Sequence, residues 1–340
     1  MARARGKAPT ILDIAAEAGV SKSAVSRALS GQGEVSAEAR ERVERAARKL
    51  GYVANAMARG LVSSQTKTIG VLLRDMTRPY YAWLQVAMQS EAEQRGYQVV
   101  TVTSAGDLGV ADALRALKNL ISLQVDGLVV SSARLPSEEI VPFIERVPIV
   151  VAGRRETSRG ITSVFCDDAD GGRVLAEHLL RLGHERIAVV LTDQAYSLSQ
   201  YARGKSMIER IQAAGKTAVV WEVATDKEAS EMIMDQIDGA EVTAVMCPTD
   251  TSAVDALEVL RQRGQSAPED YAVTGYDGFG PLSSPYLGLT TFRQPVEEIG
   301  RTSIDLLLDR LEGKTEQDRL VELRGSLVEG RTADRFPRLP

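Results

Sequence analysis

The chain has 340 residues, which predicts two or three domains and a large hydrophobic core. Hydrophobic residues make up 44% of it and charged residues 26%, with apolar periodicity along nearly the whole chain, which excludes an intrinsically disordered protein. No apolar run reaches the ~18 residues of a membrane-spanning helix, and no apolar stretch follows the basic N-terminus, so we expect neither a membrane protein nor a secretory signal. The two cysteines fit a reducing cytoplasm.

The formal charge of −5 is unevenly distributed. Residues 1–67 carry 12 Lys and Arg against 6 Asp and Glu, a formal charge of +6, whereas the remaining 273 residues carry 29 against 40, a formal charge of −11. A basic segment joined to an acidic remainder predicts that the basic segment binds a polyanion and that the acidic part has a different function.

Three short helices are predicted in the first fifty residues. Thr10 caps the first helix, which ends at Gly19, and Ser21 caps the second. Ser36 caps the third, which ends at Gly51. A tight turn joins the first two helices, as in a helix-turn-helix motif, whose second helix lies in the DNA major groove. The alternative is a small helical bundle with a solvated basic face.

The second helix carries the candidate DNA contacts. Its polar side is formed by Ser21, Lys22, Ser23, Ser26 and Arg27, all of which can donate hydrogen bonds. Ser21, at the helix N-terminus, suits a phosphate through its hydroxyl and the backbone N–H groups. Lys22, Ser23 and Arg27 are placed to reach base edges, with Arg27 best suited to guanine.

The pattern changes at Thr68, where short apolar runs begin to alternate with amphipathic stretches. Strands are predicted at 69–73, 98–102, 126–130, 148–152, 161–165, 187–191, 217–223, 242–247 and 271–275, and helices at 82–95, 111–123, 170–182, 201–214, 252–263 and 296–312. This alternation predicts parallel sheets covered by helices on both faces. About ten such units are too many for one ordinary sheet, so two α/β lobes are expected.

The ordered motifs resemble those of the LacI/GalR (lactose-repressor) family. TILDIAAEAGVSKSAVSRALS at 10–30, VSAEARERV at 35–43 and LGYVANAMARGL at 50–61 are similar to its DNA-binding region. RLGHERIA at 181–188 and PEDYAVTGYD at 268–277, with LTTFRQPVEEIG at 289–300, are similar to its core. Only the first nine residues and the last few fall outside the resemblance.

The resemblance implies an all-α helix-turn-helix head and an α/β core of two periplasmic-binding-protein-like lobes. The expected segments are a DNA-binding domain at 1–53, a hinge helix and linker at 54–67, and an effector-binding and dimerisation core at 68–340, with lobe one at about 68–166 and 294–325 and lobe two at about 167–293 and 326–340. It also implies a homodimer built on the helices at 82–95 and 111–123. The C-terminus adds no leucine heptad for a tetramer.

The same resemblance adds Thr10, Asn55 and Ala58 to the expected DNA contacts and makes Leu61 the wedge that kinks the minor groove. A helix–helix contact is the alternative for Leu61. Ala54 stands where the family often has proline, which lowers the pre-organisation of the hinge modestly. A helix of nine residues is too short to be stable alone, so we expect it to order only with DNA and a dimer partner.

A ligand is expected in the cleft between the lobes, at the carboxyl ends of the strands. The candidate effector contacts are Arg74, Tyr80, Tyr81, Ser131, Arg154, Tyr201, Thr249, Asp250 and Asp277. By resemblance, Tyr80, Tyr81 and Asp277 occupy family ligand positions. For each candidate, a solvated loop or a helix cap is an alternative role.

Some cleft positions depart from the family. Tyr201 stands where an arginine that grips the ligand is usual, and Gly153 precedes Arg154 where an aspartate is usual. The expected effector is therefore a sugar, a polyol or a phosphorylated metabolite rather than a common hexose, and an empty cleft is an alternative.

These features predict a cytoplasmic, nucleoid-associated, homodimeric transcription regulator, in the first place a repressor of carbohydrate or polyol genes that binds a palindromic operator. We expect neither an enzyme nor a cofactor nor a metal, since no G-x-G-x-x-G or phosphate-binding loop follows a strand and only two histidines are present. The alternatives are a ligand-independent or global regulator with a vestigial cleft and a ligand-binding protein of the sugar-receptor type.

Overall fold

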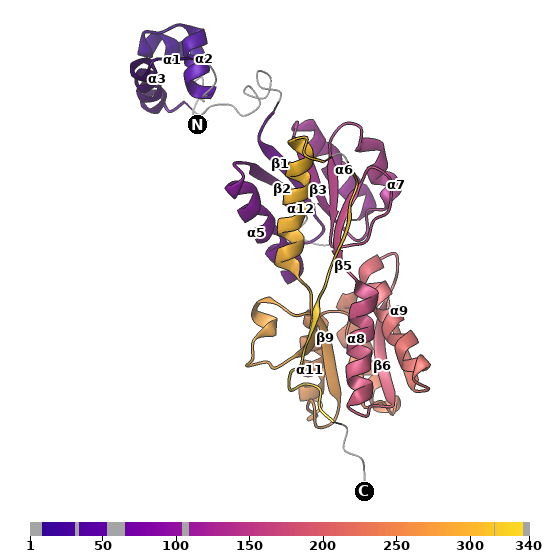
Figure 1. The fold of residues 1–340 in the computed structure, drawn as a ribbon. Helices are drawn as coiled ribbons and strands as arrows, with labels where there is room; N and C mark the ends of the chain where they lie inside the picture. The colour runs from indigo at the N-terminus through magenta and orange to yellow at the C-terminus, as the bar shows by residue number, and fades with distance from the viewer. Residues whose placement is uncertain (1–8, 31–33, 53–64, 104–108, 316, 336–340) are drawn as a thin grey trace. The chain divides into compact units, whose positions relative to one another are not determined.

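The computed structural model describes residues 9–30, 34–52, 65–103, 109–315 and 317–335. The chain divides into two compact units, Met1–Thr66 and Lys67–Pro340, here called the head and the core (Figure 1). None of the helices in the described ranges is long and apolar enough to cross a membrane.

The head is built from α1 (Ile11–Ala18), α2 (Lys22–Ser30) and α3 (Ala37–Leu50), as predicted. Ile14, Val25 and Val43, one from each helix, are fully buried against one another in a single small core. α1 begins with the predicted capping box, in which the Thr10 N–H donates to the Asp13 carboxylate over 2.7 Å. It ends at Gly19, whose φ of 63° is a left-handed conformation that favours glycine.

Lobe one of the core is a six-stranded, wholly parallel sheet in the order β11-β5-β4-β3-β1-β2. Its elements are β1 (Thr68–Leu73), α5 (Pro79–Gln94), β2 (Gln98–Val102), α6 (Val110–Ser122), β3 (Gly127–Ser131), α7 (Ser137–Ile140), η1 (Val141–Phe143), β4 (Ile149–Ala152), β5 (Thr162–Cys166), α12 (Val296–Leu311) and β11 (Leu320–Leu323). Val71 of β1 packs with α5 and α12 on one face, and Leu72 packs with α6 on the other. Burial on both faces explains the uninterrupted apolar sequence of β1.

Lobe two has a second six-stranded sheet in the order β12-β10-β9-β8-β6-β7. Its elements are α8 (Asp168–Arg181), β6 (Arg186–Thr192), α9 (Leu198–Ala213), β7 (Thr217–Val223), η2 (Asp226–Glu228), α10 (Ala229–Gln236), η3 (Ile237–Gly239), β8 (Ala244–Met246), α11 (Asp250–Gln262), β9 (Ala272–Asp277), η4 (Gly280–Ser283), β10 (Thr290–Arg293) and β12 (Ser326–Val328). α8 and α9 cover one face, and α10 and α11 cover the other. β12 is the exception to the predicted parallel pairing, because it runs antiparallel to β10.

The chain passes between the lobes three times (Figure 1). The passages are at residue 167 between β5 and α8, at 294–295 between β10 and α12, and at 324–325 between β11 and β12. Three short connections permit a hinge motion of one lobe against the other.

Candidate functional site

The polar face of α2 is the candidate nucleic-acid interface of the head. Ser21, Lys22, Ser23 and Arg27 are exposed, and Ser26 is partly buried. The Ser21 hydroxyl accepts the backbone N–H of Ala24 over 3.2 Å and lies 3.0 Å from the Ser23 hydroxyl, so it caps the helix. The buried Val25 and Ala28 hold the opposite face against the head.

The other expected DNA contacts are placed differently. Thr10 is exposed, and its hydroxyl donates to the Asp13 carboxylate over 2.7 Å within the capping box. Asn55, Ala58 and Leu61 lie outside the described residues, as does Ala54.

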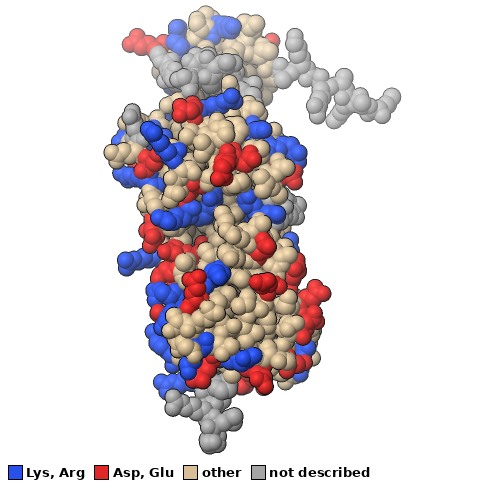
Figure 2. Space-filling view, turned by 90° about the vertical axis from the view of Figure 1, so that its right-hand side faces the viewer, with Lys and Arg blue, Asp and Glu red and all other residues tan. Residues whose placement is uncertain are grey.

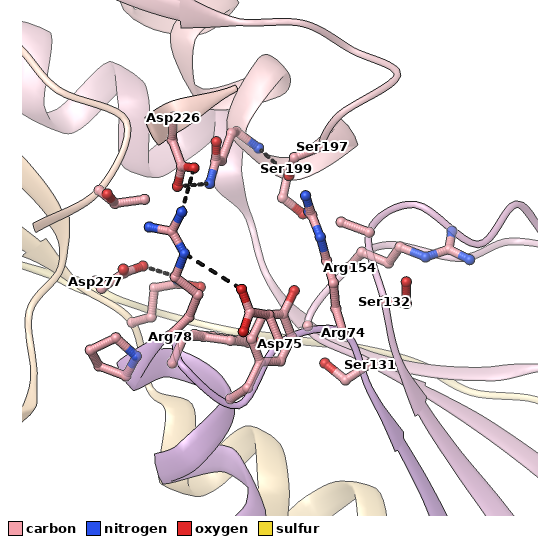
Figure 3. Close-up of a pocket in the computed structure, with 18 of the residues that line it drawn as sticks. Arg74, Asp75, Arg78, Ser131, Ser132, Arg154, Ser197, Ser199, Asp226 and Asp277 are labelled. Carbon is pink, nitrogen blue, oxygen red and sulfur yellow. Dashed lines mark hydrogen bonds and ion pairs between the residues drawn. The ribbon is translucent and has the colours of Figure 1, made fainter. Parts of the chain in front are cut away.

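Acidic and basic side chains are interspersed over the face of the core that Figure 2 presents. A cavity of about 80 Å³ lies between the two lobes at the carboxyl ends of the strands (Figure 3). Seven of the expected effector residues line it, namely Arg74, Tyr80, Tyr81, Ser131, Arg154, Thr249 and Asp277. Sites for small molecules usually enclose about 300–1,000 Å³, so this cavity is small for a ligand site.

The lobe-one wall is cationic and aromatic. Arg74 follows β1, and its guanidinium lies 4.2 Å from the ring centre of Tyr196 in lobe two. Arg154 donates to the Glu156 carboxylate over 3.0 Å, and burial lowers the pKa of its guanidinium. The ring of Tyr80 meets that of Tyr81 edge to face at 5.2 Å.

Gly153 is required by this packing. A Cβ atom at this position would lie 2.3 Å from the Tyr80 hydroxyl, and the φ of 86° favours glycine independently. The glycine at this position therefore leaves room for the ring of Tyr80.

The lobe-two wall is organised by Arg203, a residue that the sequence did not single out. Arg203 of α9 donates to the Asp168 carboxylate over 2.7 Å and to the Pro248 carbonyl over 2.8 Å, and it stacks at 3.6 Å on the ring of Tyr276. Gly172 of α8 permits this arrangement, because a Cβ there would lie 2.2 Å from the Arg203 carbonyl oxygen. Burial raises the pKa of Asp168, although Arg203 opposes this shift.

Asp277 ends β9 at the floor of the cavity. Its φ of 128° is unusual for a residue with a side chain and indicates local strain. The Gln294 side chain donates to its carboxylate over 2.9 Å, and the Gln294 backbone N–H donates to its carbonyl over 2.9 Å. Burial raises the pKa of Asp277 to about 8, with Asp250 adding to the rise and Arg203 opposing it.

Two expected effector residues, Asp250 and Tyr201, are not among the residues that line this cavity, and a role of either as an effector contact stays a prediction. The carboxylate of Asp250 accepts the Gly278 N–H over 2.7 Å and the Thr291 hydroxyl over 2.5 Å. It therefore links the end of β9 to β10 by hydrogen bonds. Tyr201 packs against the hydrophobic core, and Arg203 supplies the guanidinium that was expected to be missing.

An ion pair that the sequence did not indicate also lines the cavity. Arg78 donates to the Asp226 carboxylate over 2.7 Å across the lobes. Nothing in the sequence marks these residues, because Arg78 lies beyond the end of β1 and Asp226 lies in a connection after β7.

Histidine and cysteine serve structural roles in the core. His184 hydrogen-bonds the Thr243 hydroxyl at 2.9 Å and the Asp334 carbonyl at 3.1 Å. Cys166 and Cys247 are buried, and burial raises both thiol pKa values, that of Cys166 to about 12. Within the described ranges, no cluster of three or more His, Cys, Asp or Glu side chains could hold a metal ion.

Comparisons with known proteins cover both units. Residues 10–55 match the model of bacterial regulatory proteins of the lacI family, and residues 176–333 match a periplasmic binding protein-like domain. The HTH-type transcriptional regulator CelR of Thermobifida fusca is 33% identical over 326 residues, which cover 92% of this chain and 94% of CelR.

Solved structures give the same result. A Lac repressor dimer bound to operator and the anti-inducer ONPF is 27% identical with a TM-score of 0.82, over 96% of this chain and 100% of that one. A complex of the transcriptional regulator CelR with cellobiose is 28% identical with a TM-score of 0.68, again over 96% and 100%.

Proposed function

This chain belongs to the lacI family of bacterial regulatory proteins, and from that premise we propose that it is a repressor of carbohydrate genes whose operator affinity is set by a small effector in the interlobe cavity. The observation that carries the proposal is the polar face of α2, which presents Lys22, Ser23 and Arg27 from a helix-turn-helix head. Its relatives are transcription regulators, and we propose that it has no enzymatic activity.

In this proposal α2 enters the major groove of the operator. Lys22, Ser23 and Arg27 contact base edges, and Ser21, Ser26 and Thr10 contact or orient the phosphate backbone. The segment 54–67 forms the hinge, in which Asn55 and Ala58 contact DNA and Leu61 opens a base step. Because chromosomal DNA is its proposed partner, we propose that the protein is cytoplasmic and associated with the nucleoid.

A homodimer matches a palindromic operator, because the two-fold axis of the protein coincides with that of the DNA. We assign the dimer contact to α5 and α6. Trp83 and Val86 of α5 and Leu123 beside α6 are large apolar side chains exposed on the chain, and such exposure supports an interface in this region.

The chemistry of the cavity supports a hydroxylated effector. Arg74, Arg154 and Arg203 supply donors, Asp277 supplies a donor or an acceptor, and the ring of Tyr81 supplies a flat apolar surface. The related CelR structure holds cellobiose, which supports a carbohydrate, and a polyol or a phosphorylated sugar fits the same donors. Ser131 and Thr249 complete the proposed contacts.

The test is a selection of genomic DNA fragments by the purified full-length protein at physiological salt, followed by sequencing. The proposal predicts a shared palindrome in the retained fragments. The proposal is overturned if the retained fragments share no motif, both with and without added metabolite pools. A protein that contacts only phosphates binds all sequences alike.

A further inference from the structure

Charged side chains are unevenly divided between the two sides of the interlobe cavity. Its lining includes three carboxylates, Asp75, Asp226 and Asp277. Asp75 and Asp226 lie 3.9 Å and 2.7 Å from the guanidinium of Arg78. Asp277 lies 3.9 Å from the guanidinium of Arg203. These two arginines therefore balance the carboxylates that line the cavity.

The other two arginines of the lining, Arg74 and Arg154, both belong to lobe one. Arg74 follows β1 and Arg154 follows β4, and β3 lies between these two strands in the sheet. Ser131 at the end of β3 and Ser132 after it add two hydroxyl groups to the lining. Figure 3 shows these four residues, here called the arginine–serine cluster, on one side of the cavity and Asp226 on the other.

Arg154 is buried, and one of its donors has no acceptor among the described residues. Its Nη1 atom donates to the Glu156 carboxylate over 3.0 Å, and its Nη2 atom donates to the Leu135 carbonyl over 3.0 Å. Its Nε atom is buried and makes no hydrogen bond within the described part of the chain. A buried donor without an acceptor is costly, so this atom favours a bound molecule that supplies an oxygen atom.

The hydroxyl of Tyr80 lies beside the same part of lobe one. It is buried and makes no hydrogen bond to any residue of the described ranges. A Cβ atom at Gly153, the residue before Arg154, would lie only 2.3 Å from it. An unused hydroxyl donor and an unused guanidinium donor are thus placed at neighbouring positions of the lining.

The unsatisfied group on the opposite side of the cavity is an acceptor. Gln200 of α9 in lobe two lines the cavity, and its side-chain amide donates to the Asp226 carboxylate over 3.2 Å. Its Oε1 atom is buried and accepts no hydrogen bond from the residues that the structure describes. The lobe-one side therefore has unused donors, whereas the lobe-two side has an unused acceptor.

We propose that the arginine–serine cluster binds the anionic group, a carboxylate or a phosphate, of an acidic carbohydrate effector. This inference rests on the proposed function, because it takes the cavity as the effector site. A planar guanidinium donates two parallel hydrogen bonds to the oxygens of a carboxylate or a phosphate. Arg74 supplies one such guanidinium, which is buried and stacks at 4.2 Å on the ring of Tyr196, and Arg154 supplies its Nε donor.

The opposite side of the cavity orients the rest of this molecule. A hydroxyl group of the carbohydrate donates to Oε1 of Gln200, whereas an anionic group placed there is repelled by the Asp226 carboxylate. A neutral carbohydrate offers the two arginines weaker hydrogen bonds than an anion does, and a cationic ligand is repelled by them. The assignment depends on the charges of the two sides and not on the distance between the lobes.

The test compares acidic carbohydrates with matching neutral ones, by isothermal titration calorimetry of the full-length protein. The carboxylate pairs are D-gluconate with D-glucitol and cellobionate with cellobiose, and the phosphate pair is D-glucose 6-phosphate with D-glucose. We expect at least one acidic molecule to bind, and its neutral counterpart to bind at least about tenfold more weakly, because a hydrogen bond to a charged group is lost. The pair that shows this preference identifies the anionic group as a carboxylate or a phosphate.

Arg74→Gln then tests the assigned position with the acidic molecule that binds. This variant is expected to lower the affinity for the acidic molecule by about tenfold or more, and that for its neutral counterpart much less, whereas Arg74→Lys keeps the charge and loses less affinity. The matched control is Arg210→Gln, which removes an arginine–carboxylate pair with Glu177 inside lobe two and should leave both affinities unchanged.

A neutral molecule that binds as tightly as its acidic counterpart would overturn the proposal, and so would the absence of binding by every acidic molecule. An equal loss of both affinities in Arg74→Gln would also overturn it, because Arg74 would then have only a structural role. The comparison of the ligands needs only the unmodified protein, so it stands if Arg74→Gln does not fold.

The same protein separates this inference from the proposed function. Operator selection by the unmodified protein tests the function, and the preference for acidic molecules tests the anion site. A protein that selects no palindrome but prefers an acidic molecule through Arg74 loses the function and keeps the anion site. One that selects a palindrome but binds neutral molecules as tightly keeps the function and loses the anion site.

Discussion

The head and the cavity of the core hold their polar side chains in opposite ways. On α2 of the head, Lys22 and Ser23 are exposed to solvent. In the cavity, Arg203 and Asp226 are 5% and 3% exposed, and each is already bonded to other protein groups. A partner of the head displaces water, whereas a partner of the cavity displaces other side chains.

This difference suggests why the two sites suit different tasks. An exposed polar face can meet a long polyanion without rearrangement of the head. A cavity whose groups are paired across two lobes cannot accept a ligand without moving those lobes or their side chains. Because a ligand shifts a conformational equilibrium only through its different affinities for the two states, the paired cavity suits a switch.

The difference between the exposed head and the buried cavity predicts its largest effect on stability when an ion pair is removed. Arg203→Met removes the buried partner of Asp168 and is expected to lower the stability of the core by about 3–5 kcal/mol. Lys49→Met removes the exposed partner of Glu17 in the head and is expected to cost less than about 1 kcal/mol. Hydrogen exchange of the full chain reports each unit separately. Equal losses of stability in the head and in the core would contradict this difference.

The second prediction concerns DNA affinity. Lys22→Ala and Arg27→Ala are each expected to weaken binding to the selected operator by about 1–3 kcal/mol, and Arg27→Ala to relax the preference at one base position. Arg261→Ala, an exposed arginine on α11 that pairs with Glu258, is the control and should leave affinity unchanged. Fluorescence anisotropy measures all three. If both α2 variants bind the operator as tightly as the unmodified protein, α2 is not the helix that contacts the bases.

A third prediction tests the close packing that positions Arg203. Gly172→Ala places a methyl group against the backbone of α9 and is expected to destabilise the core by about 1–3 kcal/mol. Gly239→Ala meets no atom within 4 Å and serves as the matched control. Urea unfolding followed by tryptophan fluorescence reports the core, since Trp83 and Trp221 both lie there. An equal stability of the two variants would contradict this packing.

The smallest predicted effect is a pH dependence. Asp277 has a folded-state pKa of about 8 and an ordinary unfolded one, so its protonated form stabilises the fold fully below about pH 4, and this stabilisation is lost as the pH rises through 8. Relative to Asp277→Asn, the unmodified protein should lose about 1 kcal/mol of stability between pH 7 and pH 8. The difference reports Asp277 together with its effect on Asp250 and Asp168, whose charges act on the same carboxyl group. If the stability of the unmodified protein and that of Asp277→Asn change with pH in the same way, the pKa of Asp277 is not raised.

The sequence predicted best what is decided locally. The caps at Thr10, Gly19 and Ser36 depend on neighbours a few residues away, and the head helices begin and end at them. The nine predicted strands of the core are all present, and most of them, such as β3, are buried and uniformly apolar. The strands β10, β11 and β12 were not predicted. β11 and β12 lie at sheet edges, where none of their residues is fully buried.

The candidate site was only partly predictable, because its remaining contacts are tertiary. Residues at strand ends, such as Arg74 and Ser131, follow from the position of the strand alone. Tyr201 and Arg203 lie about 200° apart around α9, and Arg203 is the one that lines the cavity. Arg78 and Asp226 are 148 residues apart in the sequence, so their contact is a tertiary one that local patterns do not indicate.

The most direct test of the central claim compares two DNA duplexes. The affinity of the full chain for the selected palindrome is measured against a scrambled duplex of the same composition, by fluorescence anisotropy at physiological salt. A sequence-specific operator-binding regulator binds the palindrome at least about 10³-fold more tightly. Equal affinities for the two duplexes would contradict the account.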